Sequence, residues 1–144
     1  MRRTREVRGL YGIATVLLAF TLLIFPGCGE RQINYPNRQM PPGLKEDVAQ
    51  LRLGHELFMS KCASCHGKPS EGRSGRANFF RPPAPDFTDL HYRDMDPAYL
   101  YWRIEVGKTV EPYRSQGSVM PAWGVHFTEQ QTWQIVAYLQ SRAH

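Results

Sequence analysis

The sequence is poor in cysteine and has no second pair of closely spaced cysteines. Its 144 residues contain only three, Cys28, Cys62 and Cys65. A tetrahedral zinc site needs four ligands, usually two short pairs of cysteine or histidine. Here His91 and His126 would have to complete the set, and they lie much too far apart in the chain to form a short histidine pair. The cysteine pattern therefore argues against zinc.

The sequence also lacks internal repeats and alternating apolar and polar runs of useful length. Alternation with a period of two is the signature of a half-buried strand. Without it, we expect an all-α fold. The missing strand before Cys62 also argues against a redox-active dithiol, which is expected in a βαβ setting.

Beyond its N-terminal segment, the chain has little excess charge of either sign. The formal net charge is +5, but four arginines and one glutamate fall within the segment 1–27. From Cys28 onward there are 14 basic and 12 acidic residues, a net charge of +2. This balance gives no reason to expect a nucleic-acid partner.

No apolar run reaches the roughly 20 residues that a membrane-spanning helix needs. The run over residues 10–25 falls short of this length and follows four arginines. A basic start, a short apolar run and small residues are typical of an export signal. We predict a cleaved, lipoprotein-type signal peptide over residues 1–27, with a permanent anchor as the alternative.

Cys28 directly follows this run, in Phe25-Pro26-Gly27-Cys28-Gly29. A cysteine after a small residue at this place resembles a bacterial lipoprotein cleavage box, although Phe25 and Pro26 depart from the usual residues. An odd thiol is a liability in an oxidising compartment, and lipidation removes it. We expect lipid on Cys28, which would hold an exported protein on the periplasmic side of a bacterial membrane.

Residues 28–43 are polar and proline-rich without apolar periodicity, which predicts a flexible tether before a domain over residues 44–144.

Helical patterns in this domain predict three main helices. They are expected over residues 44–60, from the Asp96-Pro97 start to Gly107, and from the Thr128 capping box nearly to His144. The loops between them have about twenty residues, which a compact domain tolerates only around a large apolar cofactor.

The segment Cys62-Ala63-Ser64-Cys65-His66 carries the chemistry. Cys-x-x-Cys-His is the attachment signature of haem c. Two thiols one helical turn apart can reach the two vinyl groups on one edge of a porphyrin, and His66 then points at the iron. We therefore predict one covalent haem c on Cys62 and Cys65, with His66 as an axial ligand of the iron.

The second axial ligand is predicted to be Met120. It lies far beyond His66 in the chain, in an irregular segment before the last predicted helix. A thioether favours reduced iron and raises the reduction potential relative to a second imidazole. A site with two imidazoles, using His91 or His126, is the alternative.

Together these motifs closely resemble the small class I cytochromes c, especially the cytochrome c domains attached to cbb-type haem-copper oxidases. The resemblance covers residues 44–144. It is carried by Gly54-x-x-x-Phe58, Cys62-x-x-Cys65-His66-Gly67, Pro82-Pro83-Ala84-Pro85-Asp86-Phe87, Ile104-x-x-Gly107, Met120-Pro121-Ala122-Trp123 and Ala137-Tyr138-Leu139.

The resemblance implies that the first and last helices cross where Gly54 lets Tyr138 approach. It also implies that His66 donates a ring hydrogen to a loop carbonyl, for which Pro82 or Pro83 is the expected partner. Four further residues are either hydrogen-bond donors to the haem propionates or ordinary core and surface groups. They are Trp102, Arg103, Tyr113 and Arg114.

The function implied is one-electron transfer by a carrier that is not itself an enzyme and binds no small-molecule substrate. Its partners would be other redox proteins or a membrane respiratory complex. Three alternatives stay open. They are a haem subunit fixed in a larger oxidoreductase complex, an internal relay of a dehydrogenase, and a ligand-binding or peroxidase-like protein whose Met120 detaches.

Overall fold

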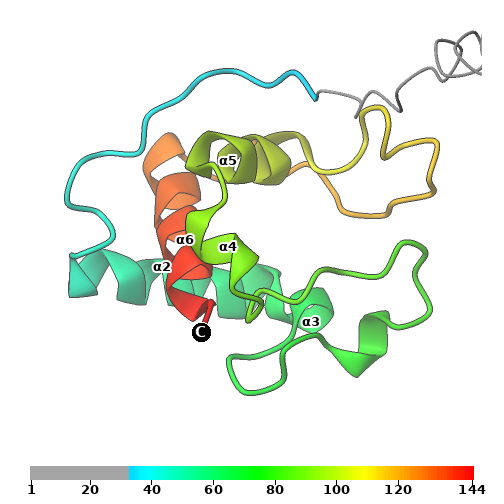
Figure 1. The fold of residues 1–144 in the computed structure, drawn as a ribbon, viewed down its shortest axis with the longest axis horizontal. Coiled ribbons are helices and arrows are strands. Elements are labelled where there is room, and N and C mark those ends of the chain that lie inside the picture. The colour runs from blue at the N-terminus through cyan, green and yellow to red at the C-terminus, as the bar shows by residue number, and fades with distance from the viewer. Residues whose placement is uncertain (1–32) are drawn as a thin grey trace, which may run out of the picture. The chain divides into compact units, whose positions relative to one another are not determined.

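The structure is a computed structural model that describes residues 33–144. The predicted signal over residues 1–27, and Cys28 with it, lie outside the described residues. Tyr35–His144 form one compact unit. Within that unit all regular structure is helical, which confirms the all-α prediction (Figure 1). In the described part of the chain, no helix has the length and apolar character needed to cross a membrane.

Helix α2 spans Val48–Lys61. It begins there because the Asp47 carboxylate accepts hydrogen bonds from the backbone nitrogens of Ala49, at 2.8 Å, and Gln50, at 3.1 Å. The start is four residues later than the predicted segment, and Val48 remains 79% exposed instead of joining the apolar face. A second short helix, α3 over Ala63–His66, follows almost without interruption.

The other helices follow their predicted signals. Helix α5 spans Pro97–Val106, with the Asp96 side chain as its N-terminal cap. Helix α6 spans Glu129–Arg142 and opens with a reciprocal capping box, Thr128 to Gln131. Two short elements lie in the long loop after α3. They are the 3-10 turn η1 at Gly75–Ala77 and the helix α4 at His91–Asp94.

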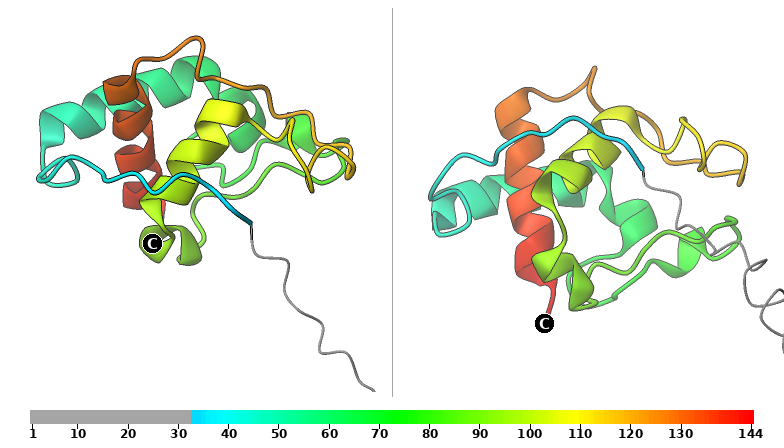
Figure 2. Two further views of the ribbon diagram at one scale, coloured as in Figure 1. Left: turned by 90° about the horizontal axis from the view of Figure 1, so that it is seen from above. Right: turned by 45° about the horizontal axis from the view of Figure 1, so that its top comes forward.

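Helix α6 lies at the centre of the domain and is buried over residues 132–140. It crosses α2, and both α4 and α5 also pack against it (Figures 1 and 2). At the crossing, a Cβ atom on Gly54 would clash with the Gln134 carbonyl group and lie 3.0 Å from Cβ of Tyr138. Only glycine permits this approach, which agrees with the role that the resemblance implied.

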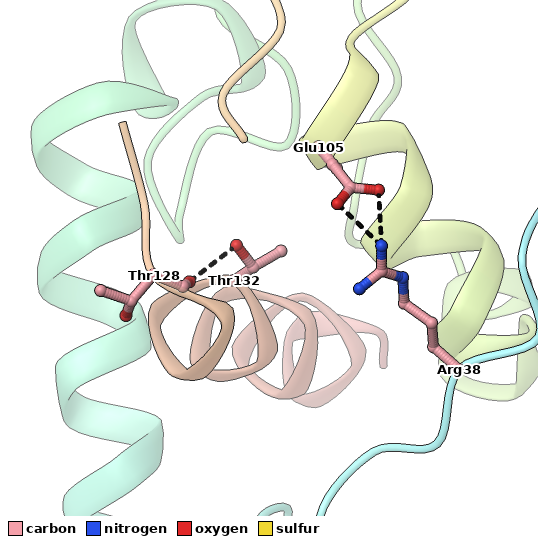
Figure 3. A network of polar contacts seen from close by, with 4 residues as sticks. All are labelled: Arg38, Glu105, Thr128 and Thr132. Atoms are coloured by element: carbon pink, nitrogen blue, oxygen red, sulfur yellow. Dashed lines mark hydrogen bonds and ion pairs between the residues drawn. The ribbon is translucent and has the colours of Figure 1, made fainter. Parts of the chain in front are cut away.

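The segment over residues 35–43 differs from the predicted flexible tether. The Tyr35 hydroxyl donates a hydrogen bond of 2.6 Å to the Asp96 carboxylate. Arg38 forms an ion pair of 2.9 Å with Glu105, near the end of α5 (Figure 3). Residues 35–41 have no regular secondary structure, and a turn over residues 42–46 leads from them into α2. The contacts of Tyr35 and Arg38 place this segment along α5. The folded unit therefore begins at Tyr35 and not near Leu44.

Candidate haem-binding site

One cavity brings the attachment motif and Met120 together. Its volume is about 280 Å³, close to the lower end of the size range of ligand and cofactor sites. Its lining is mostly apolar and is drawn from residues 61–66, 80–85 and 118–123 and from Lys108. The two long loops, one between α3 and α4 and the other between α5 and α6, extend to the same side of the helices in Figure 2. They supply most of this lining.

The attachment side of the cavity is held by one helical turn. The backbone nitrogen of Cys62 donates to the Phe58 carbonyl at 2.8 Å, so Cys62 continues the hydrogen bonding of α2. The nitrogens of Cys65 and His66 both donate to the Cys62 carbonyl, at 3.1 and 3.0 Å. Both cysteines are free thiols and both line the cavity. This turn has the spacing that two thioether bonds to one porphyrin edge require.

His66 is buried and oriented by the following loop. Its Nδ1 lies 3.4 Å from the Pro85 carbonyl oxygen. The centroids of the His66 and Phe87 rings are 4.8 Å apart. The partner is therefore Pro85, not Pro82 or Pro83 as expected. Burial lowers the pKa of His66 to about 4, so the imidazole is neutral at physiological pH. A neutral ring with Nδ1–H bonded to a carbonyl leaves Nε2 as a metal ligand.

The two alternative uses of the cysteines fit this geometry poorly. Burial, with Cys65 close by, raises the pKa of the Cys62 thiol to about 12. A redox-active dithiol needs a thiolate with a lowered pKa instead. Across residues 33–144, no three side chains of histidine, cysteine, aspartate or glutamate are grouped so that they could hold a metal ion. A zinc site built on Cys62 and Cys65 therefore has no further ligands there.

The Met120 side of the cavity is held by backbone hydrogen bonds to the end of α5. The Lys108 nitrogen donates to the Met120 carbonyl at 3.1 Å. A little further on, the Trp123 nitrogen donates to the Ile104 carbonyl at 3.0 Å. Gly107 has a φ of +61°, and a Cβ atom there would lie 2.5 Å from the Met120 carbonyl oxygen. The glycine thus lets the Met120 segment lie directly against the helix terminus.

The other candidate axial ligands lie elsewhere. His91 is exposed and pairs with Asp89, with 2.8 Å between Nδ1 and the carboxylate. His126 is also exposed, and neither histidine lines the cavity. Met40, Met59 and Met95 pack against the helical core instead. Met120 is the methionine among the described residues that lines the cavity.

Arg142, near the end of α6, was not singled out by the sequence. Its guanidinium donates to the carbonyls of Gly67 and Lys68, at 3.2 and 3.1 Å, and lies over the Phe58 ring. It therefore ties the last helix to the chain that leaves the attachment motif. No local pattern could have indicated this contact, because it joins residues 75 positions apart.

Arg103 provides a test of whether these residues fit haem. Its side chain is only 6% exposed, and none of its three nitrogens has a hydrogen-bond partner among the described residues. Burial lowers its pKa below the ordinary value. No carboxylate of the described chain pairs with Arg103 or with Lys108, which lines the cavity. A buried, unpaired cation is costly. Arg103 does not itself line the cavity, but Lys108 does, and a cofactor with anionic propionates would supply the partner that Lys108 lacks, so the site fits haem.

The chain also matches known proteins. The family model described as "Cytochrome C oxidase, cbb3-type, subunit III" matches residues 49–139. A solved quinohemoprotein alcohol dehydrogenase from Pseudomonas putida HK5 is 28% identical, with a TM-score of 0.44. That match covers 82% of this chain but only 15% of the dehydrogenase. A search of curated proteins gave no match. By the family model, the chain belongs to the cbb3-type cytochrome c family, whose members bind covalent haem c and transfer electrons.

Proposed function

We propose that this protein is a membrane-linked electron carrier of a bacterial respiratory chain. Its haem c is bound through Cys62 and Cys65, with His66 and Met120 as the axial ligands of the iron. The observation that supports the ligand assignment most is the shared cavity, since His66 and Met120 are far apart in the chain and yet line the same space.

In this proposal each residue has a defined task. Cys62 and Cys65 would hold the haem covalently, each through a thioether to one of its two vinyl groups. The Pro85 carbonyl orients His66, and the end of α5 fixes the Met120 segment. The mostly apolar lining would limit the access of water to the iron. The haem supplies the one-electron chemistry, between its ferric and ferrous states.

A redox titration of Met120→His followed by visible spectroscopy tests the sulfur ligand. We expect the far-red band from sulfur to ferric iron to vanish and the reduction potential to fall, because imidazole favours ferric iron more than a thioether does. Val119→His is the matched control, since Val119 adjoins Met120, also lines the cavity and is 56% exposed. An unchanged band and potential in Met120→His would refute the assignment.

Carbon monoxide separates this function from a ligand-binding or peroxidase-like one. If Met120 stays bound, the reduced protein should bind little carbon monoxide, because no coordination position is open. Rapid and complete binding by the wild type would instead favour a displaceable Met120. Met120→Ala is the positive control, since it should open the position without changing the attachment motif.

The proposed link to the membrane is a lipid on Cys28 of an exported chain. It is supported by the apolar run, the small residue before Cys28 and the odd number of cysteines. Intact mass and partitioning into a detergent phase test it. We expect the wild type to carry acyl chains and partition with detergent, and Cys28→Ser to do neither. A water-soluble wild type without acyl mass would contradict the lipid anchor.

The short link between Cys28 and the compact unit favours a local relay over a long-range shuttle. Only six residues separate Cys28 from Tyr35, where the compact unit begins. At about 3.3 to 3.6 Å per residue, the linking chain reaches about 25 Å at most. This reach suits a carrier that works with partners at the membrane surface, including a subunit of a larger complex. Co-purification of a second redox protein in mild detergent, lost in Cys28→Ser, would support a fixed partner.

A further inference from the structure

Residues 35–43, called the N-terminal strap below, make two aromatic contacts that the proposed function does not use. The Tyr35 ring stacks on Trp102, with 5.9 Å between centroids and 26° between planes. The same ring meets Tyr99 edge-on at 5.4 Å. The strap is held in this position by two contacts, the bond from Tyr35 to Asp96 and the ion pair from Arg38 to Glu105.

The two rings that Tyr35 covers belong to the aromatic cage of Arg103. The guanidinium carbon of Arg103 lies 3.8 Å from the Trp102 centroid, 4.4 Å from that of Tyr113 and 5.9 Å from that of Tyr99. The hydroxyls of Tyr99 and Tyr113 are 2.8 Å apart and tie the cage together. Tyr113 also contacts Lys108, which lines the cavity. The cage therefore connects the strap to the cationic part of the cofactor site.

Covering the cage has an electrostatic consequence. A charge acts more strongly on its surroundings where water is excluded, because the effective dielectric constant is lower. A cation near the haem favours the ferrous state, which carries one positive charge fewer than the ferric state. Arg103 does not line the cavity, but its guanidinium lies on the Tyr113 ring, which also contacts the cavity-lining Lys108. The drier the surroundings of Arg103 are, the higher the reduction potential should be.

We propose that Tyr35 is a positioning residue for the haem, which raises the reduction potential by covering the aromatic cage of Arg103. This proposal rests on the proposed haem site, but it does not depend on the lipid at Cys28.

The test compares the midpoint potentials of the full-length wild type, Tyr35→Ala and Tyr35→Phe, each with haem attached. Tyr35→Ala uncovers the cage, so the equilibrium constant for reduction should fall about threefold, which is about 28 mV at 59 mV per tenfold for one electron. Tyr35→Phe loses the bond to Asp96 but keeps the ring, and the ion pair from Arg38 to Glu105 still holds the strap, so its potential should match the wild type. Hydrogen exchange across α5 should rise in Tyr35→Ala alone.

Met40→Ala is the control for a merely structural role. Met40 lies in the strap and packs against the core, away from the cage contacts given above. Its truncation should lower the free energy of unfolding and leave the potential unchanged. An equal fall of potential in Met40→Ala would show that the potential follows stability, and this would overturn the proposal.

Two further outcomes would also overturn it. A wild-type potential in Tyr35→Ala would show that the cage is not sensitive to its cover. An equal fall in Tyr35→Phe would assign the effect to the released Asp96 carboxylate instead of the ring. Covalent haem, measured from the spectrum of the denatured protein with pyridine, separates these results from a failure of the proposed site, because that failure would remove the haem itself.

Discussion

The two sides of the haem cavity are built in different ways. Cys62, Cys65 and His66 share one helical turn that continues α2, so their relative positions follow from local geometry. Met120 lies in irregular chain, and its place depends on backbone hydrogen bonds to the far end of another helix, α5. Covalent attachment of haem should therefore depend mainly on the residues of the motif itself. Ligation by Met120 should depend on the contact between its segment and α5.

The largest effect is expected on the attachment side. In Cys62→Ala with Cys65→Ala, no thiol remains to form a thioether, so covalent haem should be lost completely. Haem staining after denaturing electrophoresis measures this. Ser64→Ala, between the two cysteines and exposed, should retain full staining. Stained protein in the double variant would contradict the assigned attachment sites.

A substitution at the crossing of α2 and α6 should weaken the frame of the attachment side. In Gly54→Ala the added Cβ meets the Gln134 carbonyl, and overpacking of this kind costs up to about 3 kcal/mol. Denaturant unfolding should show the loss, while the far-red band of the folded protein persists. Gly75→Ala is the control, because its Cβ would have no neighbour closer than 4.0 Å. Equal stability of both variants would argue against the close crossing.

Gly107→Ala should act on the Met120 side instead. Its Cβ would meet the carbonyl groups of Met120 and Pro121, and its positive φ adds backbone strain of about 1 to 3 kcal/mol. We expect the far-red band to weaken while covalent haem is retained. Gly117→Ala has a similarly positive φ, but its nearest neighbour would be the Arg81 carbonyl at 3.4 Å. The comparison separates the clash from the strain, and an intact band in Gly107→Ala would be evidence against this hold on Met120.

The smallest effect is expected from Arg142→Met. This change removes the hydrogen bonds to Gly67 and Lys68 and retains most of the apolar volume, so it should cost about 0.5 to 1.5 kcal/mol. Hydrogen exchange should increase after the attachment motif and not near Met120. Arg93→Met is a matched control, because Arg93 also donates to a backbone carbonyl, that of Ala143. Increased exchange near Met120 would show that the two sides are coupled through α6.

The sequence allowed most of the helices to be predicted because their ends carry local signals. The Asp96-Pro97 start, the Gly107 end and the Thr128 capping box all appear where expected. The contacts between the strap and α5 could not be predicted, for a physical reason. Polar, proline-rich chain has no apolar periodicity whether it is free or lies extended on a surface, so the partners of Tyr35 and Arg38 on α5 left no local pattern.

What the sequence determined by itself is the chemistry of attachment, since Cys62, Cys65 and His66 lie within one helical turn and their spacing fixes what they can bind. The tertiary structure decided which distant groups complete the site. Pro85 orients His66, Arg142 ties down the chain after the motif, and Met120 lines the same cavity. Such contacts arise only when the core packs, because each depends on where two segments far apart in the chain come to lie.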